Sequence, residues 1–265
     1  MAIKTLFAIF GNPVSHSRSP LMHNYFFKEW KIPACYGRYR LERGEELLSK
    51  FRELGLEGAN VTVPFKEWAY RLADRVEGVA KEVGAVNTLV RRGEEVVGYN
   101  TDGLGLKLSL GEREFESVLI LGAGGTAKAL SPIYPNATIL NRSPGRLEWF
   151  KKRGHPCFSW EEFDPSSNRY QLIINTTSAG LNDDSLPLPH SKLVEVLKKG
   201  EMAVDVIYNR LTPFLKLATQ LGLETKDGLG MLVYQGVLAM ELFLGRELPR
   251  DEVARLYFSI LNGGE

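Results

Sequence analysis

Short apolar runs alternate with segments of helical periodicity along the first hundred residues. Residues 6–10 have the pattern of a buried strand, and Ser19-Pro20 then marks the start of a helix expected to reach about residue 30. The further elements expected in this half are strands at 36–41 and 59–63, helices at 45–54 and 66–74, and a hairpin of strands at 86–90 and 96–99. This alternation predicts a mainly parallel sheet covered by helices.

The second half repeats the alternation with short, strongly apolar strands. These strands are expected at 118–121, 138–140, 172–174 and 203–207. The most apolar long stretch, 229–244, contains Gln235 and Glu241 and falls short of the roughly 18 apolar residues of a membrane span, so it predicts a buried helix. A last helix at about 251–261 is expected to pack back onto the first half. The fold class predicted is therefore α/β.

Composition excludes several classes of protein without naming a function. The 265 residues carry 33 basic and 32 acidic side chains, a net charge of +1, and 44% of them are hydrophobic, which is typical of a soluble globular protein. This balance indicates no nucleic-acid or membrane partner, and residues 6–10 are too few for a secretory signal. Two distant cysteines and four histidines without metal-ligand spacing predict neither a disulfide nor a metal site. We therefore expect a cytoplasmic protein.

A glycine-rich segment directly follows the predicted strand 118–121. Gly122, Gly124 and Ala127 have the spacing of a dinucleotide-binding fingerprint, in which the glycines permit a tight turn and the approach of a pyrophosphate. The helix that begins there offers free N–H groups and a partial positive charge to the phosphates. A glycine turn needed only for backbone geometry is the competing interpretation. Prolines at 132 and 135 predict that this helix is short.

The segment after the next strand indicates which dinucleotide would bind. NAD-binding proteins place a carboxylate there, about twenty residues beyond the glycines, for the ribose hydroxyl. This chain has Asn141-Arg142-Ser143 instead, with Arg146 one turn further. Because a guanidinium pairs with a phosphate that a carboxylate would repel, the sequence favours NADP over NAD. A solvated surface arginine is the alternative interpretation of Arg142.

Two serines mark the loop that precedes the first helix. Ser17 and Ser19 lie at a loop-to-helix junction, where hydroxyls and helix N–H groups could hold a small anion. Capping of the helix by Ser19 alone is the simpler interpretation.

Further polar clusters stand where predicted strands of the first half end. Asn60 and Thr62 share one face of a strand, and Lys66 begins the next helix, whose N-terminus disfavours a positive charge. The clusters 84–88 and 99–103 follow the same pattern, and each alone is typical of a turn or a cap. Because the carboxyl ends of neighbouring strands meet at one edge of a sheet, these clusters together predict a ligand pocket there.

These motifs, in this order, resemble the shikimate dehydrogenase family over nearly the whole chain. The stretches that carry the resemblance are 11–13, 17–20, 23–24, 58–66, 84–89, 100–103, 122–125, 141–143, 175–180, 205–208 and 227–235. The resemblance implies an NADP-dependent oxidoreductase that reversibly reduces 3-dehydroshikimate to shikimate in the chorismate pathway of aromatic amino-acid biosynthesis. It also implies a two-domain fold, with an N-terminal α/β substrate domain and a doubly wound, Rossmann-type NADP-binding domain.

The resemblance also assigns boundaries and roles. The substrate-binding and catalytic domain would span 1–104, with helices of 236–265 packing back onto it, and the NADP-binding domain would span 105–235. Lys66 and Asp102 would form the catalytic pair, with Lys66 either the proton donor or a polarising group. The substrate-binding residues would be Ser17, Ser19, Asn60, Thr62, Asn87, Asp102, Tyr208 and Gln235. The cofactor-binding residues would be Gly122, Ala123, Gly124, Gly125, Thr126, Asn141, Arg142, Ser143, Arg146, Val206 and Gly228.

A few departures and rival functions accompany the resemblance. Thr126 and Lys128 stand where family members usually have alanine and arginine. A quinate/shikimate dehydrogenase of broader specificity is the alternative, but such relatives typically have threonine at the position of Ser19 and an acid after the second cofactor strand. A module that binds NADP without turnover would lack Lys66 or Asp102, and both are present. The expected partners are NADP and the small-molecule substrate, and the protein is expected to be a monomer or a homodimer.

Overall fold

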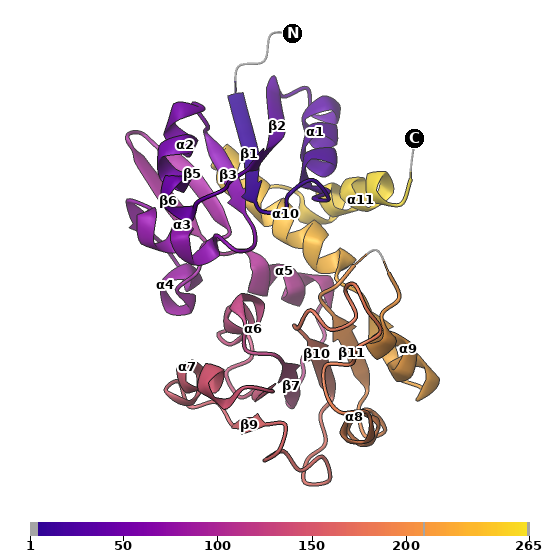
Figure 1. The fold of residues 1–265 in the computed structure, drawn as a ribbon. Coiled ribbons are helices and arrows are strands. Elements are labelled where there is room, and N and C mark those ends of the chain that lie inside the picture. Colours follow the sequence, from indigo (N-terminus) through magenta and orange to yellow (C-terminus); the bar gives the residue numbers. More distant parts are fainter. Residues whose placement is uncertain (1–4, 209, 264–265) are drawn as a thin grey trace. The chain divides into compact units, whose positions relative to one another are not determined.

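The computed structural model describes residues 5–208 and 210–263, and the chain divides into two units. The first unit comprises Met1–Gly105 and Val233–Glu265, and the second comprises Leu106–Leu232. The chain passes from one unit to the other inside two helices, α5 (Asp102–Ser109) and α10 (Leu229–Leu244), which are labelled in Figure 1. None of the helices in the described ranges is long and apolar enough to cross a membrane.

The first unit is built on a six-stranded sheet in the order β2-β1-β3-β5-β6-β4. Its strands are β1 (Thr5–Gly11), β2 (Ala34–Arg40), β3 (Gly58–Val61), β4 (Arg75–Val76), β5 (Thr88–Arg92) and β6 (Glu95–Tyr99). Its other helical elements are α1 (Ser19–Glu29), η1 (Gly44–Glu46), α2 (Leu47–Glu53), α3 (Lys66–Leu72), α4 (Val79–Val83) and α11 (Arg250–Leu261). The sheet is mixed rather than mainly parallel, because the predicted hairpin inserts β5 antiparallel between β3 and β6.

Alternate side chains of this sheet enter two separate cores. Phe10 and Ala59 point to one face, in an apolar cluster with residues of α2, α3 and α4. On the other face Phe7 packs against Phe243 of α10, with ring centroids 4.8 Å apart. Gly58 lies on this second face, where a Cβ would overlap the Phe243 ring, so the missing side chain lets α10 lie close to the sheet. Helix α11 lies beside α1 in the same unit (Figure 1).

The second unit contains an all-parallel sheet in the order β12-β11-β10-β7-β8-β9. Its strands are β7 (Val118–Leu121), β8 (Thr138–Asn141), β9 (Cys157–Ser159), β10 (Leu172–Asn175), β11 (Met202–Asp205) and β12 (Glu224–Lys226). Its other helical elements are α6 (Gly125–Leu130), η2 (Pro144–Leu147), α7 (Glu148–Lys151), α8 (His190–Leu197) and α9 (Pro213–Gln220). This is the strand order of a doubly wound Rossmann sheet, which confirms the predicted fold class.

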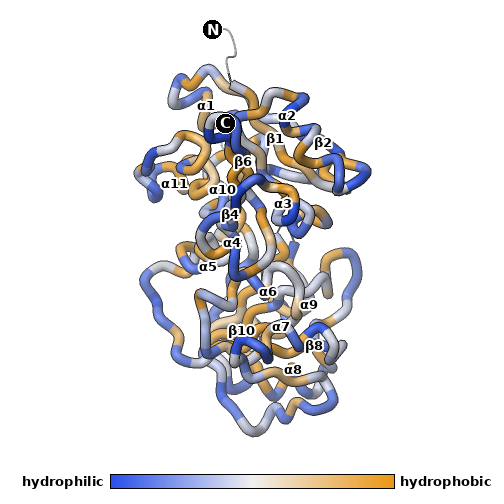
Figure 2. Tube along the Cα trace, turned by 90° about the vertical axis from the view of Figure 1, so that its left-hand side faces the viewer, coloured by the Kyte–Doolittle hydropathy of each residue, from blue (hydrophilic) through white to orange (hydrophobic). Residues whose placement is uncertain are grey.

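Continuous apolar strands explain why helices cover both faces of the second sheet. Ile120 and Ile174 lie in a cluster with α6 and α7, while Leu121 and Ile173 lie in another with α8 and α9. The apolar residues of β7 and β10 are buried, and Figure 2 shows many hydrophilic segments of this unit in its outer loops. Helix α6 has 6 residues and ends before Pro132, as predicted for a helix followed by prolines.

Two predicted strands end two residues earlier than expected. β3 stops at Val61 rather than residue 63, and β11 stops at Asp205 rather than residue 207. In both cases the residues that follow leave the sheet and form loops. Those loops carry the candidate site residues Thr62 and Val206 at the carboxyl ends of the strands, where ligands bind in open α/β sheets.

Candidate active site

The candidate site of the first unit begins where β3 ends. Asn60 is buried within the strand, and the Thr62 N–H still donates to the Phe10 carbonyl at 2.9 Å after the strand has ended. The Phe65 N–H then donates to the Thr62 carbonyl at 2.9 Å, which closes a turn into α3. Lys66 is the first residue of that helix. A tight strand-to-helix turn therefore sets the position from which the lysine side chain extends.

The start of α5 supplies the carboxylate. Asp102 is the first residue of this helix, and its side chain is 7% exposed. Asn100 orders the turn before it, because its Oδ1 accepts the Asp102 N–H at 3.0 Å and its Nδ2 donates to the Ala85 carbonyl at 3.0 Å. A carboxylate in the first turn of a helix is stabilised by the free N–H groups and the helix dipole.

Lys66 and Asp102 meet in what we call the central ion pair. The lysine Nζ donates to the aspartate Oδ2 at 2.7 Å, and the two side chains are 22% and 7% exposed. The other carboxylate oxygen accepts from the Asn87 amide nitrogen at 2.8 Å. Because an ammonium carries three donors, Lys66 can hydrogen-bond a substrate oxygen while Asp102 holds it in place. The arrangement can therefore orient and protonate a small polar substrate.

Asn60 joins the site to the core through neighbours that the sequence did not single out. It lies opposite Thr88 in the β3–β5 ladder, and its Nδ2 donates to the Thr88 Oγ1 at 3.1 Å. Its Oδ1 accepts from the Tyr36 hydroxyl at 2.7 Å. Burial raises the pKa of the Tyr36 phenol well above its ordinary range. Thr88 appeared only within a polar cluster and Tyr36 only within a strand, because their contact with Asn60 depends on strand register.

The serine loop precedes α1. Ser17 and Ser19 are buried, with exposed fractions of 7% and 4%. The prediction that Ser19 caps the helix is wrong: Arg18 occupies the cap position, and the Ser19 N–H donates to the Ser17 Oγ at 3.3 Å. The Ser17 hydroxyl, two residues earlier, therefore accepts the hydrogen bond of the first N–H of the helix. Arg38, which was not predicted, donates to the Ser17 carbonyl at 2.6 Å and holds the loop against β2.

Gln235 belongs to the part of α10 that lies in the first unit. A Cβ on Gly105 of α5 would lie 2.7 Å from the Gln235 backbone nitrogen, so the two helices touch through their backbones. This contact is three residues beyond Asp102, and it places half-buried Gln235 against the helix that carries the carboxylate. All of the predicted catalytic and substrate-binding residues except Tyr208 therefore belong to the first unit, whereas Tyr208 is half-buried in the second.

The glycine-rich loop lies at the carboxyl end of β7. Gly122 has φ +110°, and a Cβ there would lie 2.7 Å from the Thr176 Oγ1, so both conformation and space require glycine. Gly124 caps α6 and Gly125 begins it, and a Cβ on either would meet no atom within 4 Å. This open space lies at the point where the strand order reverses between β7 and β10. The other predicted residues of the loop are Ala123, which is buried, and Thr126, which is half-buried.

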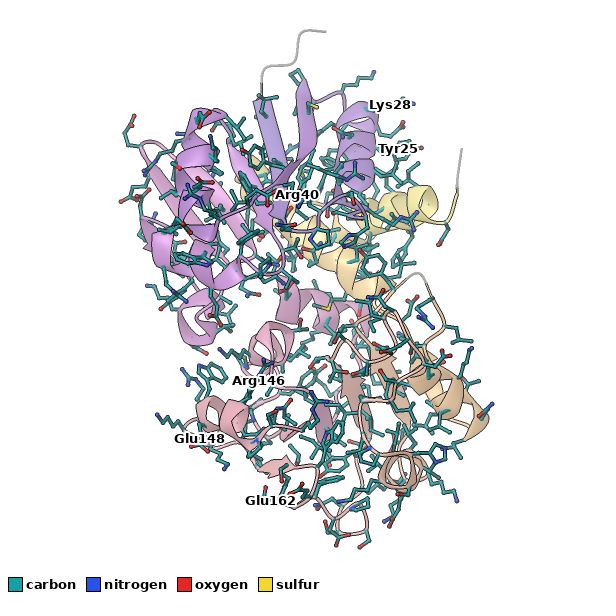
Figure 3. The ribbon with its side chains drawn as sticks, viewed as in Figure 1. Tyr25, Lys28, Arg40, Arg146, Glu148 and Glu162 are labelled. Carbon is teal, nitrogen blue, oxygen red and sulfur yellow. The ribbon has the colours of Figure 1, made fainter. Side chains whose placement is uncertain are left out.

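The predicted phosphate-binding segment begins at the end of β8. The Asn141 Nδ2 donates to the Ser143 carbonyl at 2.9 Å, which orders the turn. The guanidinium of exposed Arg142 lies over the Trp160 ring, with Cζ 5.8 Å from its centroid. Arg146 is exposed on η2 just before α7 (Figure 3). This edge of the sheet therefore offers two exposed guanidinium groups to an anion.

Val206 and Gly228 touch each other directly. A Cβ on Gly228 would overlap the Val206 carbonyl oxygen, and the Gly228 N–H donates to the Ile207 carbonyl at 3.0 Å. Asp205, a buried residue outside the predicted set, fixes this segment by accepting from the Ile207 N–H at 3.0 Å and the Thr212 Oγ1 at 2.7 Å. Burial raises the pKa of the Asp205 carboxyl above its ordinary value.

Comparisons with known proteins cover both units. A family model described as the shikimate dehydrogenase substrate binding domain matches residues 9–89, and one described as the shikimate 5'-dehydrogenase C-terminal domain matches residues 228–256. A shikimate dehydrogenase (NADP(+)) of Helicobacter pylori (strain G27) is 44% identical over 262 residues, covering 96% of this chain and 98% of the relative. Another, of Geobacillus kaustophilus (strain HTA426), is 37% identical and covers 92% and 94%.

Solved structures agree with these sequence matches. Shikimate 5-dehydrogenase from Thermus thermophilus, in complex with NADP(H) and shikimate, superposes with a TM-score of 0.84 at 29% identity, covering 97% of this chain and 100% of that one. Shikimate dehydrogenase from Aquifex aeolicus superposes with a TM-score of 0.82 at 33% identity, covering 96% and 97%. From its sequence and from its fold, the chain belongs to the shikimate dehydrogenase family.

Proposed function

We propose that this chain catalyses the reaction of its family, the NADPH-linked, reversible reduction of 3-dehydroshikimate to shikimate in the chorismate pathway of aromatic amino-acid biosynthesis. The observation that carries the proposal is the central ion pair, in which Lys66 and Asp102 lie 2.7 Å apart and largely shielded from solvent. Reduction of a carbonyl requires a positioned proton source at the substrate oxygen. A shielded lysine, held by a carboxylate at the end of a sheet, is a group of that kind.

The chain's own residues handle the proton of the reaction. When bound, NADPH supplies the hydride that reduces the carbonyl carbon. Lys66 donates to the carbonyl oxygen as negative charge develops on it, and Asp102 keeps the lysine Nζ directed at that oxygen. In the oxidation direction the same pair accepts the proton of the alcohol. Because Asp102 is buried, bulk water competes little with the ion pair that it forms with Lys66.

Hydroxyl and amide groups are proposed to bind the substrate. The Ser17 and Ser19 hydroxyls are donors beside a helix N-terminus and suit the substrate carboxylate. Asn87 acts mainly by completing the pocket, since its Nδ2 already donates to the Thr101 Oγ1 at 3.0 Å and to Asp102. The remaining members of the proposed substrate-binding set are Asn60, Thr62, Tyr208 and Gln235.

The residues of the second unit fit NADP. The open space beside Gly124 and Gly125 leaves room for a pyrophosphate next to backbone N–H groups. Arg142 and Arg146, with Asn141 and Ser143, would pair with the 2′-phosphate, and residues 141–146 contain no carboxylate to repel it. The backbones of Val206 and Gly228 are proposed to border the nicotinamide, and Gly122, Ala123 and Thr126 complete the phosphate loop.

An enzyme assay tests the proposal. Purified protein is mixed with shikimate and NADP, and NADPH formation is followed by its absorbance. We expect kcat/KM to fall by about tenfold or more when quinate replaces shikimate or NAD replaces NADP, because quinate carries an additional hydroxyl on the carbon that bears its carboxylate, and because NAD lacks the 2′-phosphate that the arginine pair would bind. Absence of NADPH formation from shikimate would refute the proposal, and equal rates with quinate would favour an enzyme of broader specificity.

We also propose that the protein acts in the cytoplasm as a monomer or a homodimer. Cys35 and Cys157 are free thiols, as expected in a reducing compartment. Light scattering on the purified protein distinguishes monomer from homodimer.

A further inference from the structure

A line of buried hydrogen bonds leads across the first sheet to the central ion pair. The Tyr36 hydroxyl donates to the Asn60 Oδ1 at 2.7 Å, and the Asn60 Nδ2 donates to the Thr88 Oγ1 at 3.1 Å. The Thr88 hydroxyl donates to the Asn87 Oδ1 at 2.9 Å, and the Asn87 Nδ2 donates to the Asp102 Oδ1 at 2.8 Å. All of these side chains are buried, so water does not compete for their hydrogen bonds.

Every donor in this line points toward the ion pair. Burial keeps the Tyr36 phenol protonated by raising its pKa, so the Asn60 Oδ1 is the atom that faces it. The Asn60 Nδ2 is thereby turned toward Thr88, and its N–H donates to the Thr88 oxygen. A hydroxyl has one proton to give, and Thr88 gives it to the Asn87 Oδ1.

The orientation of the Asn87 amide follows from this. Its Oδ1 accepts from the Thr88 hydroxyl and from the Thr101 N–H, the latter at 2.9 Å, and its Nδ2 faces the Asp102 carboxylate. With the amide flipped, its carbonyl oxygen would face a carboxylate oxygen, and two partial negative charges at that distance repel each other. The flip would also leave the Thr88 proton without an acceptor in a buried place, which is costly.

We propose that Thr88 is a positioning residue for the reaction: its hydroxyl locks the Asn87 amide, which holds one Asp102 oxygen so that the other points at Lys66. Thr88 is 0% exposed, and no hydrogen bond of the described structure joins its side chain to either member of the ion pair. It therefore acts through Asn87 alone. This inference rests on the proposed function, because it concerns the same site.

Three substitutions at one position test the role of the hydroxyl. Thr88→Val keeps the shape of the side chain and removes the hydroxyl, Thr88→Ser keeps the hydroxyl, and Thr88→Ala differs from Thr88→Ser by that one oxygen. We expect kcat for shikimate oxidation to fall about tenfold in the valine and alanine variants, with KM for shikimate changed less than about threefold, because the reacting groups are misaligned rather than removed. The serine variant should keep kcat within about twofold of wild type.

A matched control removes a different buried hydroxyl from the same unit. Tyr257 is 0% exposed, its hydroxyl lies 2.9 Å from the His23 Nδ1, and no hydrogen bond of the described residues joins it to Thr88, Asn87 or Asp102. Tyr257→Phe should lower the melting temperature and leave kcat unchanged. A fall in kcat like that of Thr88→Val would mean that general loosening of the core is the cause, and would overturn the proposal.

The remaining outcomes separate the inference from the function on which it rests. If wild type is active and Thr88→Val and Thr88→Ser have equal kcat, Thr88 has no positioning role. A Thr88→Val variant whose KM for shikimate rises while its kcat stays unchanged leads to the same conclusion. If Thr88→Val does not fold, the comparison of kcat between Thr88→Ser and Thr88→Ala tests the role of the hydroxyl. A wild-type chain that forms no NADPH from shikimate refutes the proposed function and, with it, this inference.

Discussion

Lys66 and Asp102 each occupy the first position of a helix, and their side chains meet with Nζ 2.7 Å from Oδ2. They are 36 residues apart in the chain, and a separate strand-to-helix turn positions each of them. The ion pair is therefore formed by the fold before any substrate arrives, which is the preorganisation that lowers the barrier of a charge-developing reaction.

Removal of the lysine amine is expected to abolish most of the activity. Lys66→Ala should lower kcat for shikimate oxidation by about 10²-fold or more, the usual contribution of a general acid–base group. Steady-state kinetics measures this, and the KM for NADP should stay close to wild type. Lys81→Ala, which removes an exposed lysine of α4 in the same unit, is the matched control. Wild-type turnover in Lys66→Ala would remove the lysine from the mechanism.

The two members of the ion pair are expected to act as one unit. Asp102→Asn should lower kcat by a large factor, and adding Lys66→Ala to it should cost much less than the product of the two single effects, because each partner works through the other. A double-mutant cycle on kcat measures this coupling. Fully multiplicative effects would contradict a shared role.

Alanine substitutions at two glycines of the second unit are expected to have different effects. Gly124→Ala places a Cβ in open space, so the stability of the protein alone should stay unchanged while the KM for NADP rises by about tenfold, because the pyrophosphate loses its room. Gly228→Ala forces a Cβ into the Val206 carbonyl and should destabilise the fold by about 2 kcal/mol. Thermal denaturation without NADP and steady-state kinetics separate the two effects. Unchanged NADP binding in Gly124→Ala would contradict the assignment of the loop.

Arg142 is expected to select NADP. Arg142→Ala should lower kcat/KM for NADP by about tenfold, the scale of one charge-assisted hydrogen bond, and should change that for NAD by less than about twofold. Arg169→Ala removes an exposed arginine that precedes β10, at the opposite end of the sheet from the glycine loop, and serves as the control. Equal losses with both cofactors would show that Arg142 does not read the 2′-phosphate.

His23 is expected to make the fold sensitive to mild acid. Burial lowers the pKa of His23 to about 3, from 6.5 when unfolded, so the unfolded chain takes up a proton that the folded chain refuses. Stability is therefore present above pH 6.5 and is lost as the pH falls below it, by about 2 kcal/mol between pH 7 and pH 5. His23→Phe should be less stable than wild type at pH 7, and the difference should shrink by that amount at pH 5.

Urea unfolding at the two pH values measures the effect of His23. His190→Gln, a change at an exposed histidine that begins α8, should keep the wild-type dependence on pH. A His23→Phe variant whose deficit is the same at both pH values would show that His23 has the same pKa in the folded and the unfolded protein, and would contradict the lowered pKa.

The sequence predicted the elements whose signal is local. Residues 118–121 coincide with β7, because a continuous apolar run between polar segments needs no knowledge of its neighbours. β4, β9 and β12 were not predicted, since strands of 2 or 3 residues are too short to show a period. Helices α4, α5, α7, α8 and α9 were not predicted either. The mixed character of the first sheet depends on where the hairpin inserts, which is a matter of tertiary packing.

The candidate site likewise contains residues that the sequence could predict and residues that it could not. Lys66, Asn87 and Asp102 stand in short motifs at strand ends, so sequence reasoning could select them. Tyr36 lies inside a predicted strand, and Thr88 shares a cluster with Asn87, but nothing in the sequence shows that both contact Asn60, because they reach it across the sheet from 24 and 28 residues away. These side chains meet only because of the register in which the strands pair. That register cannot be predicted from a single sequence.

The division of the first unit between the two ends of the chain has a consequence for synthesis on the ribosome. Leu106–Leu232 emerges as one uninterrupted stretch and can fold while translation continues, since domains generally fold as units. Residues 1–105 emerge earlier, yet Phe7 and His23 lack part of their aromatic packing until Phe243 and Tyr257 have been synthesised. A nascent chain halted before α11 would therefore display an unfinished aromatic core, which chaperones and proteases recognise.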